Sequence, residues 1–318
     1  MKSLSIVGRW TVNLHNLNNE GTEGNFIQPR TVTVVQNGHL YSVNAISGDM
    51  MKHIHADYFR QIALDADKKG KDAALPLSPN SIFLDPNRIS TEVEMTELLK
   101  DPKKTNADII DYTVQACSLT DVHGILMTAP KRMLPRKSRV EFGWVVAIPE
   151  QSRTEHFLHV KYAVENATKY EKGKKDETNA GQMLFHRPAS SAEYAFLAHI
   201  EVDKIGYNEI TSDSPISEEA RTARINATLQ AMVQTIMHPY GAGRSQQAPH
   251  VAGFDGVIIT SDTRMPAATV SPLEPNYIEQ SKSIVNNLNR MGGKMKLYEV
   301  PTIAKLTETI ADLIEAKV

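Results

Sequence analysis

The residues best suited to bind a charged ligand lie in short stretches that contain glycine. Ser47-Gly48-Asp49 precedes an amphipathic segment, and Lys52 and His53 follow in its first turns. A helix N-terminus offers unpaired N–H groups and a partial positive charge, so it is a natural phosphate site. Lys52 would add a full charge. An ordinary helix cap, in which Ser47 or Asp49 satisfies the first turn, explains the same residues.

A second glycine-containing stretch is Gly241-Ala242-Gly243-Arg244-Ser245. Its glycines permit a tight nest of backbone amides, and Arg244 can pair with a phosphate through two parallel hydrogen bonds. No Gly-Lys-Ser/Thr follows, so the stretch is not a Walker loop. It also follows a predicted helix and precedes a predicted strand, the reverse of a dinucleotide fingerprint. A plain connector remains an equal interpretation.

Apolar and aromatic side chains gather near a predicted hairpin, at Met183, Phe185, His186 and Arg187. An exposed methionine or phenylalanine at a hairpin tip can wedge between nucleobases or stack on them. The alternative is that these residues belong to a strand and pack into the core.

Histidines and acids do not form a convincing catalytic or metal-binding set. His53 and His55 would point to different sides of a helix, and Asp121-Val122-His123 lacks a further ligand at helical spacing. A metal site needs at least three convergent groups. No nucleophile motif of a hydrolase stands out. The sequence therefore predicts neither a metal nor a cofactor nor a catalytic residue.

The bulk composition is that of a globular protein. The 318 residues carry a net charge of −2, with 41% hydrophobic and 23% charged residues. The basic residues concentrate in two segments, 131–139 and 169–175, which indicate local basic stripes or simply two solvated loops. The single Cys117 excludes an internal disulfide, and no long apolar run is present. These features predict a cytoplasmic protein without a membrane partner.

The first half of the chain predicts a strand, a hairpin and a helix. Residues 4–14 alternate between apolar and polar, which is typical of a half-buried strand. Asn37-Gly38 joins two β-prone runs and predicts a hairpin turn. A helix is expected from Ser47 to Lys69. The polar segment 18–25 is expected to form no element.

Helices then interrupt the strand pattern and predict an inserted subdomain at 71–130, with helix starts near Thr91 and Asn106. The β pattern resumes with a strand expected at 140–148, which has Trp144 on its buried face. Strands are also expected at 156–164 and 194–202. A helix capped by Ser214-Pro215 comes next. The final expected elements are a strand at 254–260, a helix at 277–291, a strand at 296–300 and a C-terminal helix.

Without its insertion, this order is β-α-β-β-α-β, which predicts an α+β protein with a modified ferredoxin-like or RNA-recognition-motif core. Many functions share that order, so it does not identify one.

The motifs acquire a specific meaning from their joint order along residues 4–260. In that order, the chain resembles the DevR-type branch of the CRISPR-associated RAMP superfamily, the backbone family of type I Cascade complexes. The stretches that carry the resemblance are 4–6 through 17–21, 47–52, Thr120-Asp121-Val122-His123-Gly124, 139–144, 181–188 and 241–245.

The resemblance implies an RNA-recognition-motif palm of residues 1–70 and 131–318, a β-hairpin thumb at about 156–205, and the helical insertion at 71–130. It also implies partners: a CRISPR guide RNA, target DNA through guide pairing, other copies of the chain stacked into a filament, and other Cascade subunits. Binding would be independent of sequence, through backbone and shape contacts.

The resemblance also implies roles for individual residues. Ser47, Gly48 and Lys52 match a helix-start contact to the RNA backbone, and Asn18 and Asn19 match a polar loop after the first strand. The thumb and the glycine loop complete the candidate RNA-binding residues, which also include His53, Met183, Phe185, Arg187, Gly241, Gly243, Arg244 and Ser245. His53 stands where the family often has a second basic residue.

Other functions stay open at this stage. A metal-independent endoribonuclease of the same superfamily, which would cleave CRISPR repeats with His53 or His123 as acid or base, is one alternative. A metal-dependent phosphodiesterase and a structural subunit that binds no RNA are the others.

Overall fold

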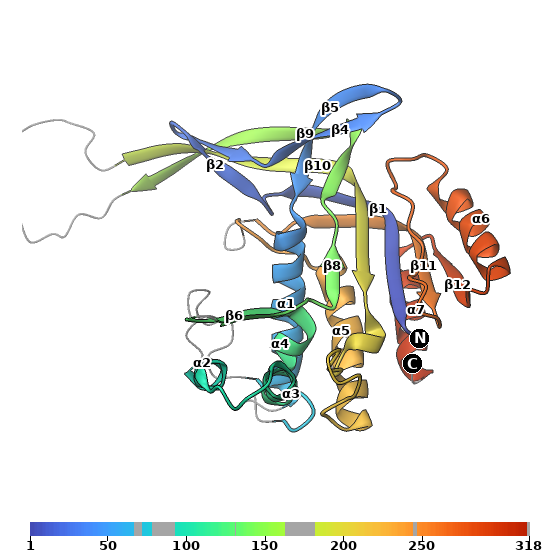
Figure 1. The fold of residues 1–318 in the computed structure, drawn as a ribbon. Helices are drawn as coiled ribbons and strands as arrows, with labels where there is room; N and C mark the ends of the chain where they lie inside the picture. The colour runs from blue at the N-terminus through green and yellow to red at the C-terminus, as the bar shows by residue number, and fades with distance from the viewer. Residues whose placement is uncertain (67–71, 78–92, 131, 163–181, 244–246, 317–318) are drawn as a thin grey trace, which may run out of the picture.

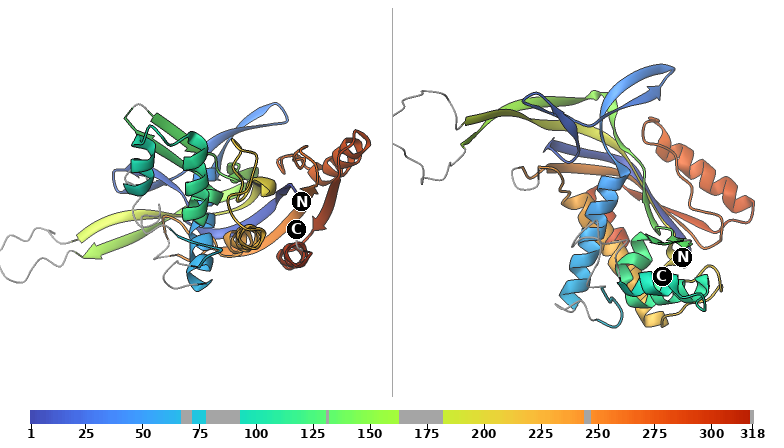
Figure 2. Two further views of the ribbon diagram at one scale, coloured as in Figure 1. Left: turned by 60° about the horizontal axis from the view of Figure 1, so that its bottom comes forward. Right: turned by 60° about the vertical axis from the view of Figure 1, so that its left-hand side comes forward.

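The computed structural model describes residues 1–66, 72–77, 93–130, 132–162, 182–243 and 247–316 (Figure 1). In these ranges, one large, mainly antiparallel sheet carries helices on both faces (Figures 1 and 2). The chain is therefore an α+β protein, as the sequence predicts. Among the described residues, no helix has the length and apolar character needed to cross a bilayer.

The main sheet has ten strands in the described part of the chain, and its principal order is β12-β11-β1-β10-β9-β5-β4. Its strands are β1 (Ser3–His15), β2 (Asn19–Glu23), β3 (Phe26–Pro29), β4 (Thr31–Gln36), β5 (His39–Ile46), β8 (Val140–Phe142), β9 (Val145–Tyr162), β10 (Gln182–Ile200), β11 (His250–Ser261) and β12 (Met295–Val300). The long β1 lies between β10 and β11 and is antiparallel to both, so the first strand in the sequence becomes the centre of the sheet.

Alternation along β1 determines which helix covers which face, because successive side chains of a strand point to opposite sides. Leu4, Ile6 and Trp10 belong to the largest hydrophobic cluster, with α1 (Gly48–Ala66), α5 (Glu218–Met237) and α7 (Ile303–Glu315). Val7 faces the other side, where it packs with Tyr277 and Val285 of α6 (Tyr277–Arg290).

A smaller cluster lies apart from these two. It joins α2 (Val93–Lys100), α3 (Asn106–Ala116) and the hairpin of β6 (Ile125–Ala129) and β7 (Arg132–Arg136) through Ile109, Val114 and Leu134. The short α4 (Ser118–His123) connects it to the main core, where Cys117 is buried. The β6–β7 hairpin was not anticipated from the sequence. The boundaries of an inserted subdomain stay a prediction, and the expected helix start at Thr91 lies outside the described residues.

Three local predictions were wrong. The polar segment 18–25 is not without structure, because β2 and β3 pair as a hairpin and the His186 amide donates to the Asn25 carbonyl oxygen at 2.7 Å. The helix α5 begins after Ser217, whose Oγ accepts from the Ala220 amide at 3.2 Å. Ser214, the expected cap, instead donates from Oγ to the Gly206 carbonyl oxygen at 2.9 Å.

The single strand expected at 140–148 is also wrong, because two strands, β8 and β9, share this segment. Phe142 pairs with Ala198 and Val146 pairs with Ala195, so one extra residue lies on this side of the ladder. Such an irregularity reorients the chain locally. As a result, Trp144, which was expected to face the core, is 46% exposed. After this irregularity, β9 also pairs with β5.

Beyond the sheet, β9 and β10 continue as a long two-stranded hairpin that projects from the body of the molecule (Figures 1 and 2). The β2–β3 hairpin lies against its base, where His186 pairs with Phe26. Because the outer parts of β9 and β10 pair mainly with each other, both faces of this hairpin are open to solvent.

Candidate nucleic-acid interface

The N-terminus of α1 is held in place by its own cap and by a residue far away in the sequence. Ser47 Oγ accepts a hydrogen bond from the Met50 amide at 3.2 Å, which is the ordinary cap that the sequence allowed. The Ser47 amide itself donates to Asn18 Oδ1 at 2.8 Å. A Cβ atom at Gly48 would overlap the Phe142 carbonyl oxygen, so only glycine lets β8 approach the helix this closely.

An open cavity of about 460 Å³ lies beside this helix start. It is lined by Ser47, Gly48, Asp49, Lys52, Ser138, Val140, Glu141, Phe142 and Trp144. Lys52 is half-buried, and burial lowers the pKa of its ammonium group, whereas Asp49 and Glu141 raise it. The cavity therefore offers the Ser47 hydroxyl, a helix N-terminus and the Lys52 ammonium group, which suit a phosphodiester. The carboxylates of Asp49 and Glu141 also line it, and Glu141 is paired with Lys137 at 2.9 Å.

Trp144 is a binding candidate that the sequence reasoning missed. It lines the same cavity, and the Arg30 guanidinium carbon lies 5.9 Å from the centroid of its ring. Because the strand pattern alone put Trp144 inside, only the bulge after Phe142 reveals that its indole is available for stacking. An indole and a guanidinium next to a phosphate-sized cavity are typical of single-strand binding surfaces.

The glycine loop lies against the end of β1. The Ala242 amide donates to the Leu17 carbonyl oxygen at 3.2 Å, and the Gly243 amide donates to the Asn16 carbonyl oxygen at 2.9 Å. A Cβ atom at Gly241 would overlap the Leu17 backbone. These two amides are engaged inside the protein, which is not the open nest that the sequence suggested. Arg244 and Ser245 lie outside the described residues.

Residues 16–19 therefore join the two glycine-containing motifs. Asn16 and Leu17 hold the loop after α5, and Asn18 holds the start of α1. The side chain of Asn19 is half-buried and that of His53 is exposed, on the second turn of α1. The structure thus brings Asn18, Asn19, Ser47 and Gly241 to one side of the molecule.

A buried polar network supports the same segment. The Leu17 amide donates to His15 Nδ1 at 3.4 Å, so the proton of this imidazole is on Nε2, which lies 2.5 Å from the Tyr194 hydroxyl. Tyr194 donates in turn to Asn44 Oδ1 at 2.5 Å. Burial lowers the pKa of His15 to about 4, so the imidazole is neutral near pH 7.

Both predicted wedge residues, Met183 and Phe185, lie in the β10 strand of the projecting hairpin. Met183 lies in β10 opposite Lys161, and its side chain is outside the described part. Phe185 is half-buried, stacks on His159 with ring centroids 6.0 Å apart, and is covered by the Arg187 guanidinium at 4.6 Å. Phe185 is therefore a component of a small aromatic and cationic cluster, not a bare wedge.

Other apolar residues of the hairpin are more exposed than Phe185. Leu158 is 58% exposed and Leu184 47% exposed, and both lie on the face opposite Phe185. On that face, Phe26 stacks on His186 with centroids 4.1 Å apart and an interplanar angle of 2°. Adjacent Phe157 and Leu158 indicate two apolar faces of the strand, but no local pattern shows that both faces stay in solvent.

Only part of the basic segment 131–139 lies at the surface, where Lys137 is exposed and Arg132 is half-buried. Arg136 and Arg139 are buried, and Arg136 pairs with the buried Asp121. Arg224 donates to the same carboxylate at 2.7 Å, while Arg139 donates to Glu209 at 2.8 Å. Two positive charges predicted at the surface, those of Arg136 and Arg139, are therefore paired with carboxylates in the interior. The second basic segment, 169–175, and Lys131 lie outside the described residues.

The candidate metal ligands are also engaged in the interior. Asp121 is held by its arginines, and His123 Nε2 lies 2.8 Å from His55 Nδ1. Burial holds the pKa of both imidazoles low, to about 4 at His55. Across the ranges the structure describes, no group of histidine, cysteine, aspartate or glutamate side chains has the arrangement of a metal site.

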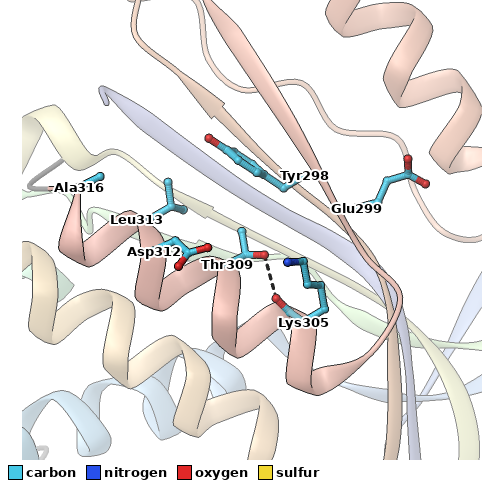
Figure 3. A pocket seen from close by; sticks show the side chains of 7 residues that line it. All are labelled: Tyr298, Glu299, Lys305, Thr309, Asp312, Leu313 and Ala316. Atoms are coloured by element: carbon cyan, nitrogen blue, oxygen red, sulfur yellow. Dashed lines mark hydrogen bonds between the residues drawn. The ribbon is translucent and has the colours of Figure 1, made fainter.

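A second cavity, of about 420 Å³, lies between β12 and α7 (Figure 3). Tyr298 extends over the helix, and Lys305 and Asp312 contribute one charge of each sign, while Thr309 donates within the helix to the Lys305 carbonyl oxygen at 2.8 Å. Since none of the binding motifs contributes to it, this cavity is separate from the surface around α1.

Comparison with known proteins now identifies the class. Two chains of structures described as CRISPR RNA-guided surveillance complexes share the fold, with TM-scores of 0.53 and 0.50 at 12% identity, and each comparison covers 99% of this chain and 100% of the other. The fold is thus one found among CRISPR-associated proteins. The family described as "CRISPR-associated negative auto-regulator DevR/Csa2" matches residues 6–282, and the chain belongs to this family.

Individual relatives agree with this assignment. A "CRISPR-associated protein Cas7/Cst2/DevR" of Methanocaldococcus jannaschii is 27% identical, over 98% of this chain and 99% of its own length. The "CRISPR-associated aCascade subunit Cas7/Csa2 2" of Saccharolobus solfataricus is 25% identical, over 80% of this chain and 78% of its own. The resemblance inferred from the sequence motifs is confirmed.

Proposed function

We propose that this chain is the repeated backbone subunit of a type I Cascade complex and binds the guide RNA without regard to its sequence. The observation that carries the proposal is the convergence of Ser47, Lys52 and Trp144 on one open cavity, in a protein of the DevR/Csa2 family. Hydroxyl groups, a helix N-terminus and an ammonium group recognise a phosphodiester, and an indole stacks on any base. None of these groups reads the edge of a base pair.

The topology supports a ferredoxin-like palm. Once the hairpins and the edge strands are set aside, the order along the chain is β1, α1, β9, β10, α5 and β11, and the order across the sheet is β11-β1-β10-β9. An antiparallel sheet in this order, with α1 and α5 on one face, is the ferredoxin-like arrangement. The projecting β9–β10 hairpin corresponds to the thumb that such a backbone subunit would use to displace a guide nucleotide.

The electrostatics also suit repeated copies on one strand. The net charge is −2, so stacked copies would not repel one another as strongly basic proteins would. A few local cations per copy can still hold the phosphates, because backbone affinity depends on the local contacts. Sequence specificity would then come from base pairing between guide RNA and target DNA. The name of the Saccharolobus relative, an aCascade subunit, supports assembly with further Cascade subunits.

The endoribonuclease alternative receives less support. His123 is buried against His55, and burial holds its pKa well below the ordinary value. An imidazole in that position does not reach a bound strand to exchange protons with it. Incubation of the purified protein with repeat RNA and no metal tests this directly, and cleavage that is lost on His53→Ala would favour the nuclease.

The proposal itself is tested by the RNA that the protein carries. Purification from the native host, or with the other subunits and a guide, should yield protected RNA whose length grows in regular steps with the number of bound copies. The Lys52→Ala, Arg244→Ala double variant should lose this RNA and the assembly. Lys282→Ala with Arg290→Ala removes the same charge from α6 and serves as the matched control. Full retention of RNA and assembly by the first variant would refute the proposal.

A further inference from the structure

A cavity of about 390 Å³ lies between α1, the end of α5 and the segment before β11. Its lining residues are Tyr58, Gln61, Gln234, His238, Pro239, Tyr240, Gln247, Ala248 and Pro249. None of them belongs to the candidate interface described above. Gly241 follows Tyr240 directly, so one wall of the cavity leads into the loop that Leu17 and Asn16 hold.

The aromatic wall of this cavity is fixed by hydrogen bonds. The Tyr58 hydroxyl donates to the His238 carbonyl oxygen at 2.6 Å and lies 2.9 Å from His238 Nδ1. The Tyr240 hydroxyl donates to Asp57 Oδ2. The two tyrosine rings meet edge to face with centroids 5.5 Å apart. A ligand would therefore meet rings that are already in position, so little ordering cost remains for binding.

The chemistry of the lining favours an uncharged, planar, polar ligand. No lysine or arginine occurs among the described residues that line the cavity, and the Asp57 carboxylate is hydrogen-bonded to its wall. Among the described lining residues, a phosphate group would therefore meet no cationic side chain and would lie close to the Asp57 carboxylate. The glutamine amides of Gln234 and Gln247 supply both donors and acceptors, and Gln61, whose Nε2 donates to Asp57 Oδ2 at 2.9 Å, adds its acceptor oxygen. Such amides beside aromatic rings can satisfy the polar edge of any nucleobase.

We propose that this cavity receives one nucleobase of the RNA strand whose backbone passes the Gly241–Gly243 loop. The inference rests on the proposed RNA-binding function and adds a position to it. One base per copy leaves the strand and enters the cavity, which fixes the register of the RNA relative to each subunit. Because the glutamine amides accept different base edges, the site selects for the presence of a base and not for its identity.

RNA with a single abasic ribose tests this inference. A set of oligonucleotides that carries the abasic residue at each position in turn is bound to the assembled protein, and affinity is measured by fluorescence anisotropy. The wild type should show one sensitive position per bound copy, where loss of the base weakens binding about tenfold, in the range of a single stacking contact. Elsewhere, removal of the base should have a much smaller effect.

The same set of abasic oligonucleotides is then bound to the Gln234→Ala, Gln247→Ala double variant. This variant should bind intact RNA more weakly, and the penalty at the sensitive position should disappear, because the cavity no longer holds the base. Gln230→Ala removes the same side chain from an exposed position of α5 and should behave as the wild type. Thermal melts of all variants show whether the substitutions affect folding.

The outcomes separate this inference from the proposed function. If intact RNA binds but no position is sensitive, or if the penalty survives in the double variant, the base cavity is refuted while RNA binding stands. Failure of the wild type to bind any RNA refutes both. A penalty that is seen only with single-stranded DNA of the same sequence would also contradict the assignment, since it would place the base of a DNA strand in the cavity.

Discussion

The side chain of Asn18 accepts a hydrogen bond from the backbone amide of Ser47 at 2.8 Å. This bond ties the segment after β1 to the first residue of the α1 cap, and the same segment holds the glycine loop through Asn16 and Leu17. The proposed RNA-binding surface thus depends on a single short connection between elements that are distant in the sequence.

Asn18→Ala should leave the Ser47 amide without its partner and lower the free energy of unfolding by about 1 kcal/mol. It should also weaken RNA binding, because the helix start is no longer fixed. Asn286→Ala removes an exposed amide from α6 and is the matched control. Denaturant titration and RNA anisotropy measure the two effects, and equal behaviour of the two variants would argue against the role of Asn18.

Lys52 and Trp144 line one cavity but should contribute in different ways. Lys52→Ala should reduce the slope of log affinity against log salt concentration by about 0.7, the value for one phosphate contact to a single strand. Trp144→Ala should weaken binding by about 1–3 kcal/mol and leave that slope unchanged, because stacking releases no counterion. Binding isotherms at several salt concentrations distinguish the two, and a changed slope for Trp144→Ala would be inconsistent with stacking.

Gly48 is predicted to be intolerant of any side chain. The added methyl group in Gly48→Ala would meet the Phe142 carbonyl oxygen, and overpacking of this kind costs about 1–3 kcal/mol. Gly21→Ala, at a position with no atom within 4 Å of the new group, should be close to neutral. Unfolding midpoints of the two variants give the comparison, and a neutral Gly48→Ala would mean that β8 does not approach the helix so closely.

The buried carboxylate of Asp121 should be among the most sensitive positions of the fold. Arg136 and Arg224 both pair with it and are themselves buried. Asp121→Asn leaves two buried guanidinium groups without a counter-charge, which costs about 3–5 kcal/mol. Glu97→Gln breaks an exposed pair with Lys100 and should cost less than about 1 kcal/mol. If the two variants unfolded at the same denaturant concentration, the buried triad would not be a stabilising element.

Stability should fall as the pH is lowered from neutrality. Burial lowers the pKa of His15 and of His55 to about 4, below the ordinary value of 6.5, so the unfolded chain binds protons that the folded chain does not. Their contribution is fully present above pH 6.5 and is lost progressively as the pH falls toward 4. Each histidine contributes a slope of up to about 1.4 kcal/mol per pH unit in that window.

His15→Gln tests this sign, because glutamine keeps a donor and an acceptor but does not titrate. Denaturant titrations between pH 7 and pH 4 should show a shallower loss of stability for His15→Gln than for the wild type. His250→Gln changes an exposed histidine and should leave the slope as it is. A wild-type free energy of unfolding that rises as the pH falls would contradict the buried, neutral state of His15.

Much of the architecture follows from local patterns. Alternation along β1, the Asn37-Gly38 turn and the apolar stripes of α5 and α7 predict their elements because period and turn chemistry are properties of a few neighbouring residues. The predictions that were wrong depended on distant partners. Polar residues 18–25 form part of a hairpin because this hairpin pairs with the outer part of β10. Trp144 turns outward because of a register shift against β10.

By itself, the sequence determined the α+β class, the order of most elements, and the glycine-containing motifs that mark the DevR/Csa2 family. Only the tertiary structure decided which charges are available to a ligand. In the sequence, Arg136, Arg139 and Lys52 are equally plausible surface cations. In the structure, the two arginines are paired with carboxylates in the interior, whereas Lys52 lines an open cavity. Burial and pairing are sums over residues far apart in the chain, so no local pattern encodes them.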